Sequence, residues 1–135
     1  MKILVLVKHV PDATGERGFA ADHTVDREAT DGLLSELDEY AVEQALRVAE
    51  DGDGVEVVVL TVGPDDAADA IKRALQMGAS AGIHVLDEAI AGSDALATSE
   101  ILAAAVRKAE PPPSARPWRW PMVWSPSAGT PTPRA

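Results

Sequence analysis

The sequence contains no cysteine, which excludes disulfide bonds, thiolate metal ligands and a thiol nucleophile. It also lacks a Walker A loop, a G-x-G-x-x-G fingerprint, an H-E-x-x-H zinc helix and a G-x-S-x-G elbow. No apolar run approaches the roughly 20 residues that span a bilayer, and Lys8 and His9 close the first run without the cleavage site of a signal peptide. We therefore expect a cytoplasmic protein with no catalytic residues, no metal site and no membrane insertion.

Basic side chains are scarce and unevenly placed. The chain has 12 Lys and Arg against 22 Asp and Glu, which gives a formal net charge of -10. Because nucleic acids are bound by clustered Lys and Arg, we expect no nucleic-acid partner. All 22 acidic side chains lie in residues 1–110, whereas residues 111–135 hold three arginines, eight of the 10 prolines and all three tryptophans. We divide the chain accordingly into a folded domain and a Pro/Trp/Arg-rich tail.

The composition of residues 111–135 predicts a disordered tail, because dense proline removes backbone donors and blocks helices and central strands. Pro111–Pro113 is also compatible with a ligand for an aromatic-lined groove, which stays open as an alternative. We favour the hypothesis that the reading frame shifts after Glu110. The bias toward Pro, Arg, Trp, Ser and Ala is that of GC-rich DNA read out of frame.

Residues 1–110 alternate between apolar runs of strand length and patterns of helical period. The predicted strands are 2–8, 55–62 and 83–86, and the predicted helices are 35–52, 64–78 and 93–110. Such an order gives a parallel sheet with helices against its faces. Ser35 and Asp38 have the spacing of a capping box at the first helix, and Gly78 is placed to end the second in a left-handed conformation.

Apolar spacing predicts which helix faces pack on the sheet. In the first helix the expected core residues are Leu37, Ala41, Ala45 and Val48, and in the second they are Ala68, Ile71 and Leu75. Between the first strand and the first helix, residues 9–34 are rich in glycine and of mixed polarity, which predicts a long functional loop. Within it, residues 19–25 are expected to form a short extended excursion.

Ligands of parallel α/β sheets bind beyond the carboxyl ends of the strands. Three segments should meet there: Lys8–Pro11, the loop up to Ser35, and Val62–Asp65. Lys8 and His9 could contact a phosphate or a ribose, although a solvated pair at the strand end explains them equally well. We interpret His84 as a core or strand-end histidine, and the acidic cluster of the first helix as a solvated face with no metal.

Four consecutive blocks resemble the electron transfer flavoprotein beta subunit in their order and separation. They are KILVLVKHVPD from residue 2, LDEYAVEQALR at 37–47, VLTVGP at 59–64 and ALQMGASAGIHV at 74–85. The resemblance covers residues 1 to about 110. It implies an α/β three-layer sandwich with a parallel sheet, of the adenine nucleotide alpha hydrolase-like type and incomplete at its C-terminal side.

The resemblance also implies a function. Members of the family are heterodimers of alpha and beta subunits that pass electrons from acyl-CoA-type or other flavin dehydrogenases to the respiratory chain. FAD is held mainly by alpha, and AMP is bound structurally in beta. Carried over to this sequence, with the strand-end pair included, the nucleotide contacts are Leu6, Lys8, His9, Ser35, Glu36, Leu37, Asp38 and Val62. Many of these would be backbone contacts or contacts to the helix N-terminus.

Two departures from the family pattern qualify this expectation. Ser35-Glu36 stands where many members have Asn-Pro. The family also continues with another strand and a glycine-rich loop around the AMP phosphate, and residues 111–135 match neither. We therefore expect a truncated beta subunit with an unpaired edge beside residues 2–8 and weakened AMP affinity. A stand-alone adenine-nucleotide-binding or stress-type module and a non-functional fragment are the alternatives.

Overall fold

Three parallel strands form the sheet in the computed structural model, which describes residues 1–27 and 29–109. They are β1 (Lys2–Leu6), β4 (Glu56–Val62) and β5 (Ala81–Val85), in the order β1-β4-β5. The register pairs Leu6 with Leu60 and Val62 with Val85. Within the described ranges β1 has only β4 as a neighbour, so it is an edge strand there, as predicted.

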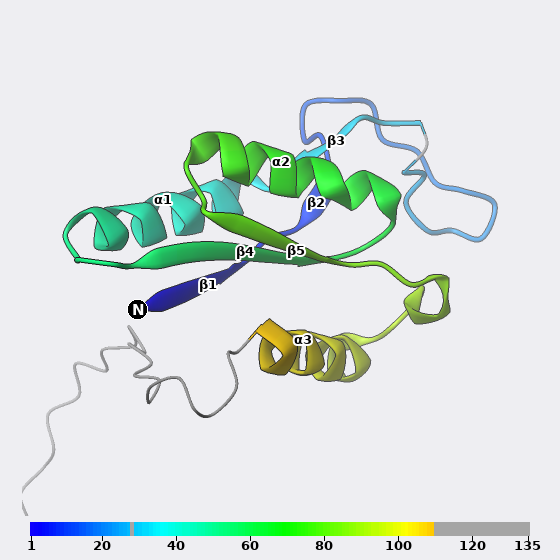
Figure 1. Ribbon diagram of the computed structural model, residues 1–135. Coiled ribbons are helices and arrows are strands. Elements are labelled where there is room, and N and C mark those ends of the chain that lie inside the picture. Colours follow the sequence, from blue (N-terminus) through cyan, green and yellow to red (C-terminus); the bar gives the residue numbers. More distant parts are fainter. Residues whose placement is uncertain (28, 110–135) are drawn as a thin grey trace, which may run out of the picture.

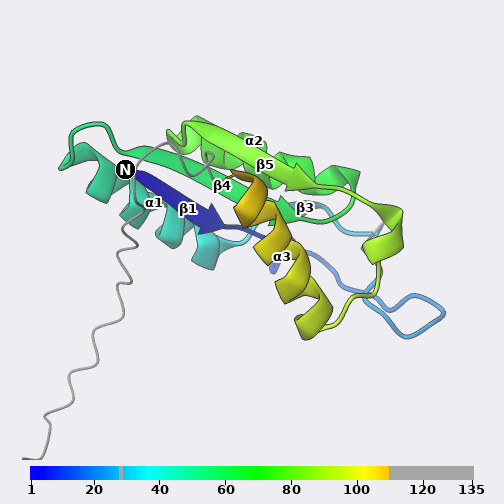
Figure 2. The same ribbon diagram turned by 60° about the horizontal axis from the view of Figure 1, so that its bottom comes forward.

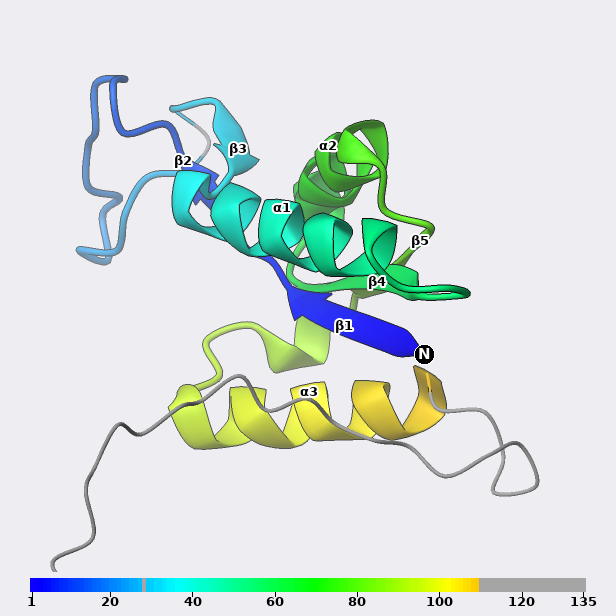
Figure 3. The ribbon, with the colours of Figure 1, turned by 90° about the vertical axis from the view of Figure 1, so that its left-hand side faces the viewer.

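Helices cover both faces of this sheet (Figures 1 and 3). α1 (Glu36–Glu50) and α2 (Ala68–Met77) lie on one face, and α3 (Ala95–Ala109) lies on the other, where Figure 2 shows it crossing the strands. Two short 3-10 turns, η1 (Asp65–Ala67) and η2 (Glu88–Ile90), lead into α2 and α3. The predicted α/β three-layer sandwich with a parallel sheet is confirmed. None of the helices in the described ranges is long and apolar enough to cross a membrane.

The main core lies between the sheet and the pair α1 and α2. Because strand side chains alternate between faces, Val57 and Val59 point to this side, where they pack with Val42 of α1 and with Ala70 and Ala74 of α2. The opposite face carries Val58 and Leu60, which are also buried. There α3 provides the cover, although Ala105 is its one buried side chain among the described residues.

The predicted helix faces are partly wrong. In α1 the buried residues are Val42 and Ala45, whereas Leu37 is 76 % and Val48 45 % exposed. α1 carries two overlapping apolar stripes, and the sequence period alone does not say which one meets the sheet. In α2 the buried residues include Ile71, as predicted, but Leu75 is exposed and small alanines take its place. Gly78 has a φ of 123°, which confirms the predicted left-handed end of α2.

The segment predicted as a loop is closed at its base by a second, antiparallel ribbon. β2 (His9–Pro11) pairs with β3 (Gly32–Leu34), so residues 12–27 and 29–31 project from the carboxyl end of the sheet (Figure 1). An isolated antiparallel bridge joins Phe19 to Val25, and the chain turns between them, so only the two ends of the predicted extended excursion are paired. The disordered tail and the frame shift, predicted for residues 111–135 and for the position after Glu110, lie outside the described residues.

Candidate functional site

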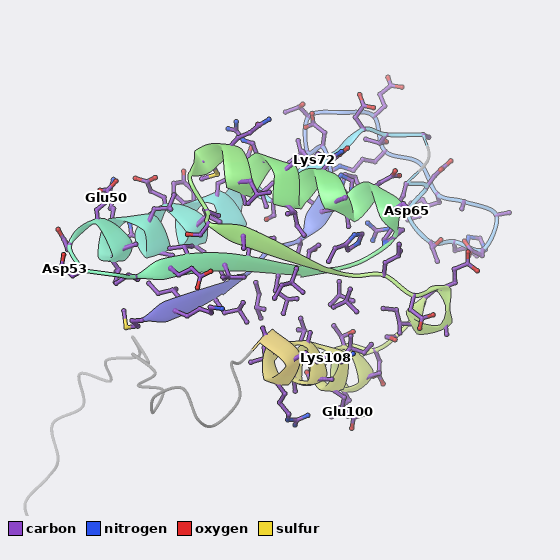
Figure 4. The ribbon with its side chains drawn as sticks, in the orientation of Figure 1. Glu50, Asp53, Asp65, Lys72, Glu100 and Lys108 are labelled. Atoms are coloured by element: carbon purple, nitrogen blue, oxygen red, sulfur yellow. The ribbon has the colours of Figure 1, made fainter. Side chains whose placement is uncertain are left out.

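The carboxyl ends of the strands meet the N-termini of α1 and α2 at one edge of the sheet. Leu6 ends β1 and Val62 ends β4. The N–H of Val7 donates to the carbonyl of Leu60 at 2.9 Å, so the two strands stay paired up to this edge. Figure 4 places Asp65, at the entrance to α2, at this end, with Glu50 and Asp53 at the opposite one. The structure therefore brings together the three segments that the sequence predicts for the site.

The first contact between these segments joins Lys8 to the start of α1. The backbone N–H of Lys8 donates to Oδ2 of Asp38 at 2.8 Å, and its ammonium lies 3.3 Å from the same oxygen. The carbonyl of Lys8 accepts from the N–H of Ser35 at 3.0 Å. Three of the residues singled out from the sequence are thus in direct contact.

The N-terminus of α1 begins where predicted, but its cap is different. Ser35 is the N-cap and is buried, yet its side chain makes no capping hydrogen bond. The predicted capping box is therefore wrong. The first N–H groups of a helix have no partner within it, so those of Glu36 and Leu37 are left for water or a ligand. Both side chains are exposed, which leaves this helix end open to the carboxyl edge.

The turn between β4 and α2 forms the second wall. The N–H of Gly63 donates to the carbonyl of Val85 at 3.2 Å, and Nε2 of His84 lies 3.0 Å from the carbonyl of Gly63. The contact requires that Nε2 carry the proton. His84 is therefore a strand-end histidine satisfied by backbone, as interpreted from the sequence, and it holds the turn that follows Val62.

His9 lies in the ribbon of β2 and β3. It pairs with Leu34 in the ribbon, and its ring occupies the space where a side chain at Gly32 would lie, which explains the glycine at that position. Hydrogen bonding from Lys72 lowers the pKa of Asp69, with smaller contributions from the charge of Lys72 and from that of His9. His9 is thus within electrostatic reach of α2.

Thr61 is a site-edge residue that the sequence analysis missed. It is 1 % exposed, and its hydroxyl is buried without a hydrogen-bond partner among the described residues. A buried polar group of this kind is uncommon and often marks a site where a ligand or water completes the structure. The sequence signal was present as the one hydroxyl within the apolar run of β4, next to Val62.

A shallow cavity of about 310 Å³ lies at the other end of the sheet. Its lining comes from the C-terminal halves of α1 and α2 and the amino ends of two strands: Leu46, Ala49, Glu50, Val55, Val57, Met77, Gly78 and Ser80. None of the predicted site residues belongs to it. Across residues 1–27 and 29–109, no group of three or more His, Asp or Glu could hold a metal ion.

Comparison with known proteins finds a matching family and several similar proteins. A family model described as "Electron transfer flavoprotein domain" matches residues 22–113. The chain is 47 % identical over 109 residues to "Electron transfer flavoprotein subunit beta" of Mycobacterium tuberculosis, covering 77 % of this chain and 41 % of the relative. It is 41 % identical over 108 residues to "Protein FixA" of Azorhizobium caulinodans, covering 80 % and 38 % of the two chains.

A third relative has a more specific name. The chain is 37 % identical over 108 residues to "Acryloyl-CoA reductase electron transfer subunit gamma" of Anaerotignum propionicum, covering 80 % of this chain and 40 % of the relative. In all three alignments this chain therefore spans about two fifths of the length of its relative.

Proposed function

Because the chain belongs to the electron transfer flavoprotein domain family, we propose that it acts as a beta-type electron transfer subunit in a heterodimer with an alpha-type subunit. The observation that carries this proposal is the 47 % identity to beta subunits over 109 residues. The pair would pass electrons from acyl-CoA-type or other flavin dehydrogenases to the respiratory chain, with FAD held mainly by alpha. The proposed compartment is the cytoplasm, and this subunit would contribute no catalytic residue of its own.

For the beta-type subunit we propose an AMP site at the carboxyl edge of the sheet. The fit rests on the start of α1, where Ser35 makes no side-chain cap, and on the Thr61 hydroxyl, both without a partner within the described part of the chain. A helix N-terminus with free N–H groups attracts anions, and the start of α1 lies beside Lys8, whose carbonyl accepts from the N–H of Ser35. The residues that form the site would be Leu6, Lys8, His9, Ser35, Glu36, Leu37, Asp38 and Val62. AMP would be structural, because it supplies no redox chemistry.

Co-expression with an alpha-type subunit tests the electron-transfer proposal. The chain would be compared with a version extended by the remaining sequence of a beta-type relative, since it spans about 41 % of such a relative. We expect co-purification with alpha, a flavin absorbance spectrum, and flavin reduction by an acyl-CoA dehydrogenase, at least for the extended version. Failure of both versions to assemble with alpha would contradict the proposal.

Nucleotide binding is tested separately on the chain itself by calorimetry with AMP, with GMP as the control for a general purine effect. AMP binding that is absent for GMP supports the adenine site. Equal heats for both nucleotides would contradict it. The Glu50→Gln variant should bind AMP like the unaltered chain, because Glu50 lies at the opposite end of the sheet (Figure 4).

A further inference from the structure

The ribbon of β2 and β3 should continue by one more residue pair than it does. His9 pairs with Leu34, so the next antiparallel pair is Lys8 with Ser35. Half of that pair is present, because the N–H of Ser35 donates to the carbonyl of Lys8 at 3.0 Å. In a hydrogen-bonded antiparallel pair the N–H of Lys8 would donate back to the carbonyl of Ser35.

That second bond is not available, since α1 begins at the same point. The carbonyl of Ser35 accepts instead from the N–H groups of Asp38 and Glu39, at 2.9 and 3.0 Å. These two bonds close the first turn of the helix. Lys8 would be left with an unpaired N–H at the junction of strand ribbon and helix.

The carboxylate of Asp38 supplies the missing acceptor. Oδ2 accepts from the N–H of Lys8 at 2.8 Å, and the Lys8 ammonium lies 3.4 and 3.3 Å from Oδ1 and Oδ2. The Asp38 side chain is 17 % exposed, against 63 % for Lys8. A hydrogen bond from a backbone N–H to a carboxylate is among the stronger ones in proteins, so this contact fixes the angle at which α1 leaves the ribbon.

We propose that Asp38 is a positioning residue of the nucleotide site. Its carboxylate binds the first turn of α1 to Lys8, just after β1. This contact keeps the uncapped N–H groups of Glu36 and Leu37 beside the strand ends. This inference rests on the AMP site proposed above. Both carboxylate oxygens are engaged by Lys8, and the Lys8 charge offsets the negative charge that Asp38 would otherwise present to a phosphate. Asp38 thus acts through the backbone that it holds.

The experiment uses the full chain and compares Asp38→Ala with Asp38→Asn. The amide oxygen of Asn accepts the same N–H, so Asn should rescue what Ala loses. Glu43→Ala is the control, because Glu43 is also acidic, lies on α1 and, among the described residues, pairs only with Arg47 of the same helix. Two quantities are measured: the hydrogen-exchange rate of the Lys8 amide, and the ratio of the affinities for AMP and for adenosine, which lacks the phosphate.

We expect Asp38→Ala to raise the exchange rate of the Lys8 amide and to lower the AMP-to-adenosine affinity ratio, each by about tenfold, the loss of one hydrogen bond to a charged group. Asp38→Asn and Glu43→Ala should change each quantity by less than about threefold. The ratio separates the roles: a direct contact of Asp38 to ribose or adenine would weaken both ligands equally, and a merely structural role would lower stability and leave the ratio unchanged.

Either of those two patterns, with AMP still bound by the unaltered chain, overturns the positioning role and leaves the proposed site intact. An unaltered chain that binds neither AMP nor adenosine overturns the nucleotide site and the positioning role together. If the Lys8 amide exchanges equally fast in the unaltered chain and in Asp38→Ala, the hydrogen bond from Lys8 to Asp38 does not hold the two segments together, and the proposal is overturned.

Discussion

Removing the hydroxyl of Thr61 should stabilise the protein while it weakens the proposed site. The side chain is 1 % exposed and its hydroxyl has no partner among the described residues. Leaving a buried polar group unsatisfied costs about 1–3 kcal/mol. Thr61→Val replaces the hydroxyl with a methyl group of nearly the same size, so we expect a gain of about 1 kcal/mol in the free energy of unfolding, which corresponds to a rise in Tm of roughly 4–8 °C for a domain of this size.

Urea denaturation followed by circular dichroism measures this gain, with Thr61→Ser as the matched control. Serine keeps the hydroxyl and loses the methyl group, so it should cost about 1 kcal/mol. A less stable Thr61→Val protein would refute the reasoning, because it would mean that the hydroxyl already has a partner in the unliganded protein. In calorimetry, Thr61→Val should bind AMP more weakly than the unaltered chain, because the hydroxyl that the ligand would satisfy is gone. Functional sites often show this trade-off between stability and activity.

Two further predictions follow from the second face of the sheet and from the projecting loop. Ala105→Glu places a charge at the buried contact of α3 with the sheet and should lower the free energy of unfolding by about 2–4 kcal/mol in urea denaturation. Ala104→Glu, on the exposed side of the same helix, should change it by less than about 0.5 kcal/mol. Equal effects of the two substitutions would show that α3 does not pack on the sheet. The pKa of Asp12 is lowered from 3.8, mainly by the backbone N–H of Thr14 and secondly by its hydroxyl. The ionised carboxylate therefore stabilises the fold above pH 3.8, and this stabilisation is lost as the pH falls through the folded pKa. Thr14→Val should move the Asp12 pKa part of the way back in an NMR titration and leave that of Asp22 unchanged; no movement at Asp12 would refute the assigned cause.

Local sequence patterns were sufficient for the three parallel strands, but not for the ribbon of β2 and β3, which lies in the segment predicted as a loop. The β-branched run of β4 is buried on both faces, as its composition predicts, and the parallel order places Leu6, Ser35 and Val62 at one edge. The helix faces were less predictable. Leu37 and Val42 are both apolar and lie on different sides of α1, and only contact with the sheet selects Val42. The helical period of 3.6 residues predicts which residues share a face of α1, but only tertiary packing decides which face is buried.

The failed capping box shows why the contacts of the site itself were out of reach of local rules. A capping box would use Asp38 to satisfy the N–H of Ser35, its neighbour in sequence. In the folded chain that N–H already donates to the carbonyl of Lys8, whereas the N–H of Lys8 has no backbone acceptor left. Binding Asp38 to Lys8 leaves one unsatisfied donor fewer than binding it to Ser35, so the partner 30 residues away prevails. A side chain at a helix start therefore has to be assigned after the strand pairing that precedes the helix, because that pairing decides which donors remain.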